Sequence, residues 1–132
     1  MAIQYSVSVN NARLDQVETT IGVSAVLKIF SGAVPANCAA ADPTGTLVTI
    51  TLPSDWMNNA ASASKTKLGT WSASASGSGT AASFRIYDST ATTCHIQGSC
   101  GQGTGDLQLD NTSIASGQTV TVNTFTLNAA NT

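Results

Sequence analysis

Two different hydrophobic patterns follow one another at the N-terminus. Over residues 3–9, apolar side chains alternate with polar ones, a period that predicts a half-buried strand. The alternative is a mobile arm that becomes ordered only against a neighbouring molecule. Leu14, Val17 and Ile21 then recur at helical spacing and form one apolar stripe. They predict a helix over residues 11–21, which must dock on another element because so short a helix is marginal alone.

The residues around this stripe include signals for both ends of the helix. Asn10 or Asn11 can cap the first turn with a side-chain oxygen, and Gly22 can end the helix in a left-handed conformation. Asp15 and Glu18 lie early enough in the predicted helix to interact favourably with its dipole.

The remainder of the chain predicts short strands separated by turns. Strands are expected over residues 25–31, 45–52, 67–75, 82–88, 93–97, 107–109 and 118–127. Small and polar residues predict loops over residues 58–66, 76–80 and 98–105. In the last strand the apolar phase shifts between Val122 and Phe125, which predicts a β-bulge or a change of buried face.

Seven or eight short strands at this spacing predict a mainly β fold, namely a single β-sandwich of jelly-roll or immunoglobulin-like type with one short N-terminal helix. A length of 132 residues suits one domain. We therefore expect residues 1–10 to form an N-terminal arm or strand, and residues 11–132 to form the sandwich domain with its helix at 11–21.

The charge content narrows the classes of partner. Only 9% of the residues are charged, against about 25% in an ordinary domain, and the five Lys and Arg side chains are scattered through a chain of net charge −2. Nucleic acids are held by clustered positive charge, so we expect no nucleic-acid partner. No apolar run approaches the roughly 20 residues that span a bilayer, and the N-terminus lacks the features of a signal peptide. We therefore expect no membrane partner, and a chain that stays in the cytoplasm where it is made.

Three cysteines and the single histidine are the candidate reactive groups. Cys94 and Cys100 lack the C-x-x-C spacing of zinc sites, and His95 follows Cys94 directly in a predicted strand. Adjacent strand residues point to opposite faces, which argues against a shared metal site or a Cys–His catalytic pair. A disulfide between Cys38 and Cys94, or between Cys94 and Cys100, and inert buried thiols are the alternatives left open.

For the carboxylates and tryptophans, a structural interpretation is also favoured over a catalytic or binding one. Asp106 and Asp110 lie four positions apart on a predicted strand, about 13 Å, which is too far for a glycosidase pair. We interpret them as solvated side chains, with a calcium site that includes Asp88 as the alternative. Trp56 and Trp71 are expected in the core or an interface, with a sugar-binding platform as the alternative. No catalytic motif is present, so we expect a non-enzymatic protein without a cofactor or metal.

Six segments resemble, in their order, a family of small virion structural proteins of tailed bacteriophages and prophages. These are NARLDQVETTIG (11–22), LKIFSGAVPANC (27–38), TGTLVTITLPSDW (44–56), GTAASFRIYDS (79–89), CHIQGS (94–99) and GDLQLDNTSIASGQTVTVNTFTL (105–127). Together they cover most of the chain. Capsid decoration, or cement, proteins are one recurring assignment in this family, and the resemblance implies no catalytic residues.

The resemblance implies a protein on the capsid surface of the virion that binds the assembled shell of the major capsid protein and stabilises it. The helix 11–21 and the N-terminal arm are the candidate contact elements, and the arm can add a strand to a neighbour's sheet edge. We also expect a homo-oligomer, such as a trimer. The alternatives are a tail or head–tail connector component and a carbohydrate-binding module that exposes Trp56 or Trp71.

Overall fold

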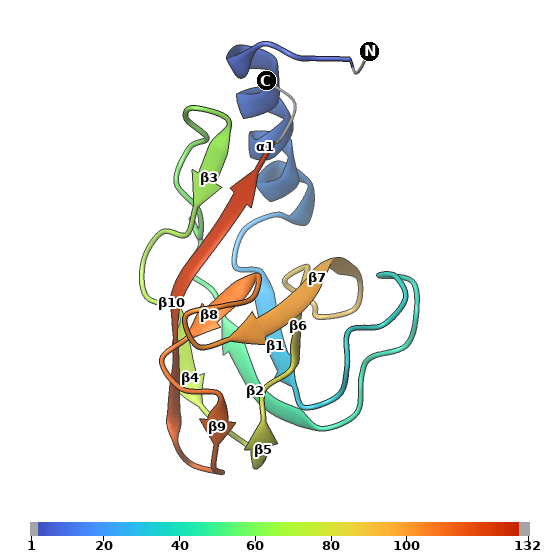
Figure 1. The fold of residues 1–132 in the computed structure, drawn as a ribbon, viewed down its shortest axis with the longest axis vertical. Helices are drawn as coiled ribbons and strands as arrows, with labels where there is room; N and C mark the ends of the chain where they lie inside the picture. The colour runs from blue at the N-terminus through green and yellow to red at the C-terminus, as the bar shows by residue number, and fades with distance from the viewer. Residues whose placement is uncertain (1–2, 130–132) are drawn as a thin grey trace.

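The computed structural model describes residues 3–129, which form a mainly β fold with one α-helix near the N-terminus (Figure 1). The helix is α1 (Val7–Ile21). The strands are β1 (Val26–Phe30), β2 (Thr46–Thr51), β3 (Ser64–Thr66), β4 (Ser72–Ser74), β5 (Gly79–Thr80), β6 (Ser83–Tyr87), β7 (Cys94–Gly101), β8 (Leu107–Leu109), β9 (Ser113–Ile114) and β10 (Thr119–Asn128). The predicted fold class is confirmed.

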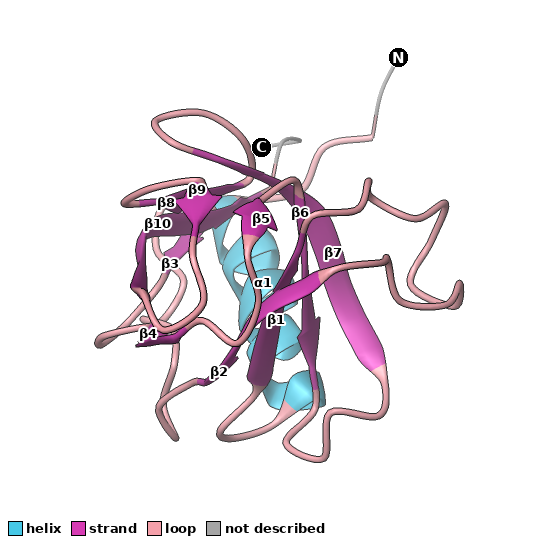
Figure 2. Ribbon diagram, turned by 90° about the horizontal axis from the view of Figure 1, so that it is seen from below, coloured by secondary structure: helices cyan, strands magenta, loops and turns pink. Residues whose placement is uncertain are grey.

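Eight of the strands form one sheet that curls around a single interior (Figure 2). The strand order is β2-β1-β6-β7-β8-β10-β3, β4 also pairs with β10, and the pairs are antiparallel except for β7 with β8. The backbone N–H groups of Ser76 and Gly77, just after β4, both donate to the carbonyl of Leu47 in β2, at 2.8 and 3.1 Å. These bonds join β2, at one end of the strand order, to the segment that follows β4, which branches from β10 near the other end. The halves of the sheet therefore face each other in a sandwich-like arrangement.

Aromatic side chains fill the centre of the core. The ring of Trp71 lies 6.0 Å from that of Trp56 and 5.7 Å from that of Phe125, and Phe125 meets Phe84 edge-on at 5.6 Å. Both tryptophans are completely buried. Tilted and edge-on ring pairs of this kind add to the free energy gained by burying apolar area, and the prediction of core tryptophans is confirmed.

The helix begins four residues earlier than predicted. Ser6, not Asn10 or Asn11, is the N-cap, and its hydroxyl oxygen accepts a hydrogen bond from the backbone N–H of Val9 at 3.2 Å. The strand expected over 3–9 is therefore wrong, because a serine cap directs residues 7–9 into the first helical turn. Only residues 3–6 remain as an extended arm within the described part, while residues 1–2 of the predicted arm lie outside it.

The predicted apolar stripe and C-terminus of the helix are confirmed. Leu14 and Ile21 are buried and Val17 packs partly buried against the core. Gly22 has φ +92° and its N–H donates to the Glu18 carbonyl at 2.9 Å, which ends the helix. The indole N–H of Trp56 donates to the Gly22 carbonyl at 2.9 Å and ties this end of α1 to the core.

Several predicted loops contain strands. β3 lies within 58–66, β5 within 76–80, and β7 continues to Gly101 through a segment interpreted as a glycine-rich loop. A Cβ at position 98 would lie 2.8 Å from a ring carbon of Phe84 and 2.7 Å from a carboxylate oxygen of Asp106. Glycine is needed there for a close approach rather than for a turn. The irregularity predicted in the last strand is confirmed, because the β10–β8 register shifts between Val122 and Thr124.

Candidate functional site

An exposed apolar surface lies at the start of the chain. We call Ile3, Tyr5, Val7 and Val9 the N-terminal patch; their exposed fractions are 75%, 39%, 47% and 44%. The arm that carries the first two residues leaves the end of α1 remote from the sheet (Figure 1). The guanidinium of Arg13, one turn further along α1, lies 4.7 Å from the centre of the Tyr5 ring and orients it. Val7 and Val9 are two positions apart on α1 and therefore point to different sides of the helix. All four side chains nevertheless lie within residues 3–9, and exposed apolar side chains concentrated in one segment are typical of a protein contact site.

A buried ion pair fixes the helix that carries this patch. The Lys65 side chain in β3 is only 1% exposed, and its Nζ lies 2.7 Å from Asp15 Oδ1 and 3.0 Å from Glu18 Oε1. Burial alone would lower the pKa of Lys65, but the two carboxylates outweigh this effect and raise it. The hydrogen bond from Lys65 lowers the pKa of Asp15 in turn. Lys65 and Asp15 are therefore charged at neutral pH.

The same helix face holds the loop before β3. The backbone N–H of Ala60 donates to Asp15 Oδ1 at 2.8 Å, and that of Ala63 donates to Asn11 Oδ1 at 2.9 Å. Asp15 therefore acts in a tertiary contact in the middle of α1, and the predicted interaction with the helix dipole is wrong because the helix starts earlier. Sequence analysis missed Lys65, although two carboxylates three positions apart on one helix face were a signal for a basic partner.

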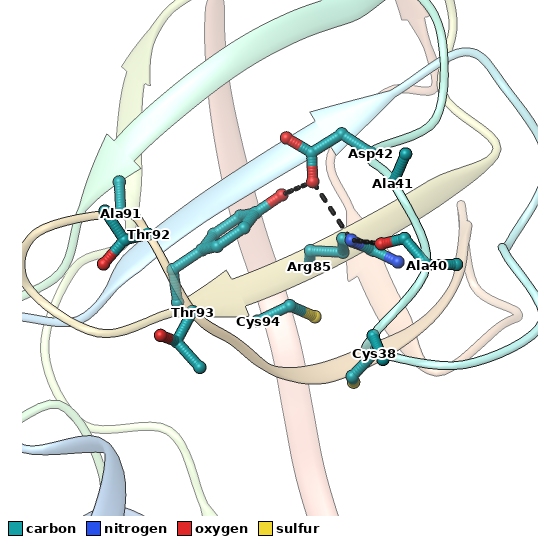
Figure 3. Close-up of a pocket in the computed structure, with 11 residues that line it drawn as sticks. Cys38, Ala40, Ala41, Asp42, Arg85, Ala91, Thr92, Thr93 and Cys94 are labelled. Carbon is teal, nitrogen blue, oxygen red and sulfur yellow. Dashed lines mark hydrogen bonds and ion pairs between the residues drawn. The ribbon is translucent and has the colours of Figure 1, made fainter.

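A hollow lies over the face of β6 that carries Arg85 and Tyr87 (Figure 3). It has a volume of about 610 Å³. Arg85 is 2% exposed, because the segment 31–45 between β1 and β2 covers it. Its guanidinium donates to the carbonyl oxygens of Ala40 at 2.9 Å and Asn37 at 3.1 Å, and to side-chain oxygens of Asp42 at 3.1 Å and Gln97 at 3.0 Å. Arg85 thus fastens this long segment to the sheet.

Two titratable groups of the hollow, Tyr87 and Cys94, are held in their neutral forms. Burial and the Asp42 carboxylate, which accepts a hydrogen bond from the Tyr87 hydroxyl, raise the pKa of Tyr87. Burial and the neighbouring Cys38 thiol raise the pKa of the Cys94 thiol to about 12. Nucleophilic catalysis uses a thiolate or another activated group, and neither Tyr87 nor Cys94 supplies one at neutral pH.

The structure separates Cys94 from His95, as predicted from their adjacent positions. Cys94 lines the Arg85 hollow together with Cys38, whereas His95 lines a different hollow beside Arg13 and Val17 of α1. Cys100 is more deeply buried, and burial followed by the charge of Asp106 raises the pKa of its thiol to about 12. Of the candidate reactive groups, only Cys38 and Cys94 are brought together.

The three aspartates weighed as a calcium site bind separate local groups. Asp106 accepts from the backbone N–H of Ser99 at 3.1 Å, and Asp110 accepts from that of Thr121 at 3.2 Å. Asp88 accepts from the hydroxyl of Thr90 and the N–H of Thr92 within its own turn. Within residues 3–129, no group of three or more His, Cys, Asp or Glu side chains is placed to hold a metal ion.

The tryptophan platform proposed for sugar binding is wrong. Trp56 and Trp71 both have no exposed surface, since each ring packs in the aromatic core described above. A sugar ring stacks on an exposed aromatic face, so neither side chain can bind one in this fold.

Comparisons with protein-family models, with curated proteins and with solved structures gave no match to this chain. In the part of the chain that the structure describes, no helix is both long and apolar enough to cross a membrane.

Proposed function

We propose that the protein is a non-enzymatic structural component of a tailed-phage virion, a capsid decoration protein that binds and stabilises the assembled shell of the major capsid protein. The observation that carries this proposal is the exposure of all four apolar side chains of the N-terminal patch. Such residues lose unfavourable contact with water when a partner covers them. The segments that resemble virion structural proteins give the class of partner.

The position of the patch supports docking on a large surface. The patch lies on the arm and the first turn of α1, and the Lys65 ion pair fixes α1 to β3. A rigid helix with a short exposed arm presents its apolar residues without a large cost in conformational entropy. Residues 3–6 are already extended and can pair with a neighbour's sheet edge.

Stabilisation then follows from mass action. A fully buried Val, Ile or aromatic side chain contributes roughly 1.5–3 kcal/mol before the costs of association, so each copy adds a modest free energy. A protein that binds only the expanded shell shifts the equilibrium toward that shell, and many copies multiply the effect. A net charge of −2 leaves little electrostatic repulsion between neighbouring copies, which also suits a symmetric homo-oligomer such as a trimer.

The absence of an enzymatic role is part of the same proposal. The raised pKa values of Cys94 and Tyr87, and the separation of His95 from Cys94, support it. In the described residues, Arg85 is bound to four protein oxygens and functions in the architecture of the segment 31–45.

The test is co-sedimentation of the purified protein with expanded shells that lack it, using Ile3→Asp and Val7→Asp variants. We expect each variant to weaken binding about tenfold or more, because a buried carboxylate replaces an apolar contact. Val23→Asp is the matched control: Val23 is 68% exposed but follows the other end of α1. Undiminished binding of both patch variants, or equal loss with the control, would contradict the proposed contact surface.

A further inference from the structure

Cys38 and Cys94 are far apart in the sequence but line the same hollow. Cys94 follows Cys38 by 56 positions, and the two side chains approach each other beside Arg85 (Figure 3). The neighbouring Cys38 thiol contributes to the raised pKa of Cys94, whose own thiol donates a hydrogen bond to the Ile96 carbonyl at 3.5 Å. Both cysteines are half-buried and neither is in a disulfide, so a small reagent can reach them.

Two independent sets of contacts bring the thiols together. Arg85 donates to the carbonyl of Asn37, the residue immediately before Cys38. Tyr87, two positions after Arg85 and on the same face of β6, pairs with Cys94 of β7. Gln97 of β7 also donates to the carbonyl of Pro35 at 2.8 Å. The segment 31–45 is therefore held against the same face of β6 and β7 on which Cys94 lies.

The geometry excludes the other candidate pair. Cys94 and Cys100 belong to the single strand β7 and are six positions apart, which is roughly 20 Å along an extended chain. A disulfide needs Cα atoms within about 4–7 Å of each other. Among the three cysteines, Cys38 is therefore the only one that can form an intramolecular disulfide with Cys94.

We propose that Cys38 and Cys94 form a reversible disulfide that closes when the protein meets a low-molecular-weight disulfide such as oxidised glutathione. The Cys38 thiolate attacks one sulfur of the reagent, breaks its S–S bond and releases one thiolate. Cys94 loses its proton to solvent and attacks the Cys38 sulfur of the mixed disulfide, which releases the second thiolate. The two protein thiols lose two electrons and two protons, and the reagent gains them as two thiols.

The order of these steps follows from the environment of Cys94. Burial and the neighbouring Cys38 raise the pKa of its thiol to about 12, so only a small fraction is thiolate at neutral pH. Closure is therefore slow and accelerates with pH. A reducing cytoplasm keeps the pair as thiols, and an oxidising medium outside the cell closes it.

The bond would strengthen the attachment of the segment 31–45 to the sheet. This segment has no strand or helix of its own. Its Asn37 and Ala40 carbonyls accept hydrogen bonds from Arg85 of the sheet, and the Asn37 carbonyl accepts another from the backbone N–H of Ala40 within the segment. A covalent link across 56 positions also restricts the unfolded chain. We expect the oxidised protein to unfold at a Tm higher by on the order of 10 °C.

The test uses the purified full-length chain equilibrated with oxidised glutathione at mildly alkaline pH. Intact-mass measurement is expected to show the loss of two hydrogen atoms, and peptide mapping without reductant to show one linked peptide pair, Cys38 with Cys94. Thermal unfolding with and without dithiothreitol measures the rise in Tm.

Cysteine-to-serine variants distinguish the pair from the third thiol. Cys100→Ser is expected to keep both the bond and the dithiothreitol-sensitive rise in Tm, whereas Cys38→Ser and Cys94→Ser lose both. The peptide map of the wild-type protein tests the pairing even if one of the variants fails to fold. A map with no intramolecular bond, a bond that includes Cys100, or a bond that leaves Tm unchanged or lowers it would overturn the inference. Shell binding is not measured in this experiment, so its outcome is independent of the proposed function.

Discussion

Lys65 Nζ in β3 lies 2.7 Å from Asp15 Oδ1 in the middle of α1, and this contact joins the only helix within residues 3–129 to the sheet. Glu18 completes the site from one turn further along the helix, at 3.0 Å. The position of the N-terminal patch depends on this attachment, because the patch extends from the same helix.

Removal of the lysine charge is the most direct test of this attachment. Lys65→Met leaves two carboxylates facing each other without a cation, and we expect it to lower the free energy of unfolding by about 2–4 kcal/mol. The loss is moderated because Asp15 is partly exposed to solvent. Urea unfolding, monitored by circular dichroism, measures this loss in the free energy of unfolding.

Lys67 provides the control on the same stretch of chain. Its ammonium group donates to the Gly69 carbonyl and is only partly buried, so Lys67→Met should cost less than about 1 kcal/mol. Equal losses for the two variants would show that the buried ion pair has no special role.

The ion pair also sets a dependence of stability on acid. Because the folded-state pKa of Asp15 is lowered from 3.8, the unfolded chain binds this proton more readily. The contribution of Asp15 is therefore fully present well above pH 3.8 and is lost as the pH falls through the lower, folded-state value. Asp15→Asn should be less stable than the wild type near pH 6 and should lose less stability between about pH 5 and pH 2. Parallel stability curves for the two proteins would contradict this assignment.

Arg85 is expected to hold the segment 31–45 in place. Arg85→Lys keeps the charge but cannot reproduce four hydrogen bonds from a planar group, so it should cost about 2–4 kcal/mol. The rates of amide hydrogen exchange at residues 37–42 should rise in the same variant.

Lys28 is the matched control, because it is the residue of β1 that pairs with Arg85 across the sheet. Its ammonium group lies 5.1 Å from the centre of the Tyr87 ring, a contact worth about 1 kcal/mol or less. If Lys28→Met loosened residues 37–42 as much as Arg85→Lys does, the anchoring role of Arg85 would be refuted.

The buried tryptophans predict a simple optical result. Neither indole contacts water, so iodide should not quench the fluorescence of the folded protein, and the emission should shift to longer wavelength only on unfolding. Trp71→Ala should cost about 3–5 kcal/mol because it leaves a cavity beside Trp56 and Phe125. Strong quenching in the native state would contradict the aromatic core.

Local periodicity predicted the elements in which apolar residues recur regularly along the sequence. The stripe of Leu14, Val17 and Ile21 located the helix, and the alternation around Phe84 and the phase shift after Val122 located β6 and the irregularity in β10. These features depend on one residue type recurring at a fixed spacing, which the sequence displays directly.

The features that sequence analysis missed depend on contacts between distant segments. The burial of Lys65 requires α1 to lie beside β3, and that of Arg85 requires the segment 31–45 to fold over β6. Gly98 is a strand residue because of Phe84 and Asp106, not because of its neighbours in sequence. The N-cap at Ser6 was hidden by an alternation of apolar residues that is exposed rather than buried.

The number of copies of this chain relative to the major capsid protein, measured by quantitative mass spectrometry on purified virus particles, tests the proposed function most directly. A decoration protein predicts a copy number in a simple ratio to the capsid subunit. A few copies per particle would instead indicate a tail or connector component, and absence from the particles would contradict a structural role in the virion.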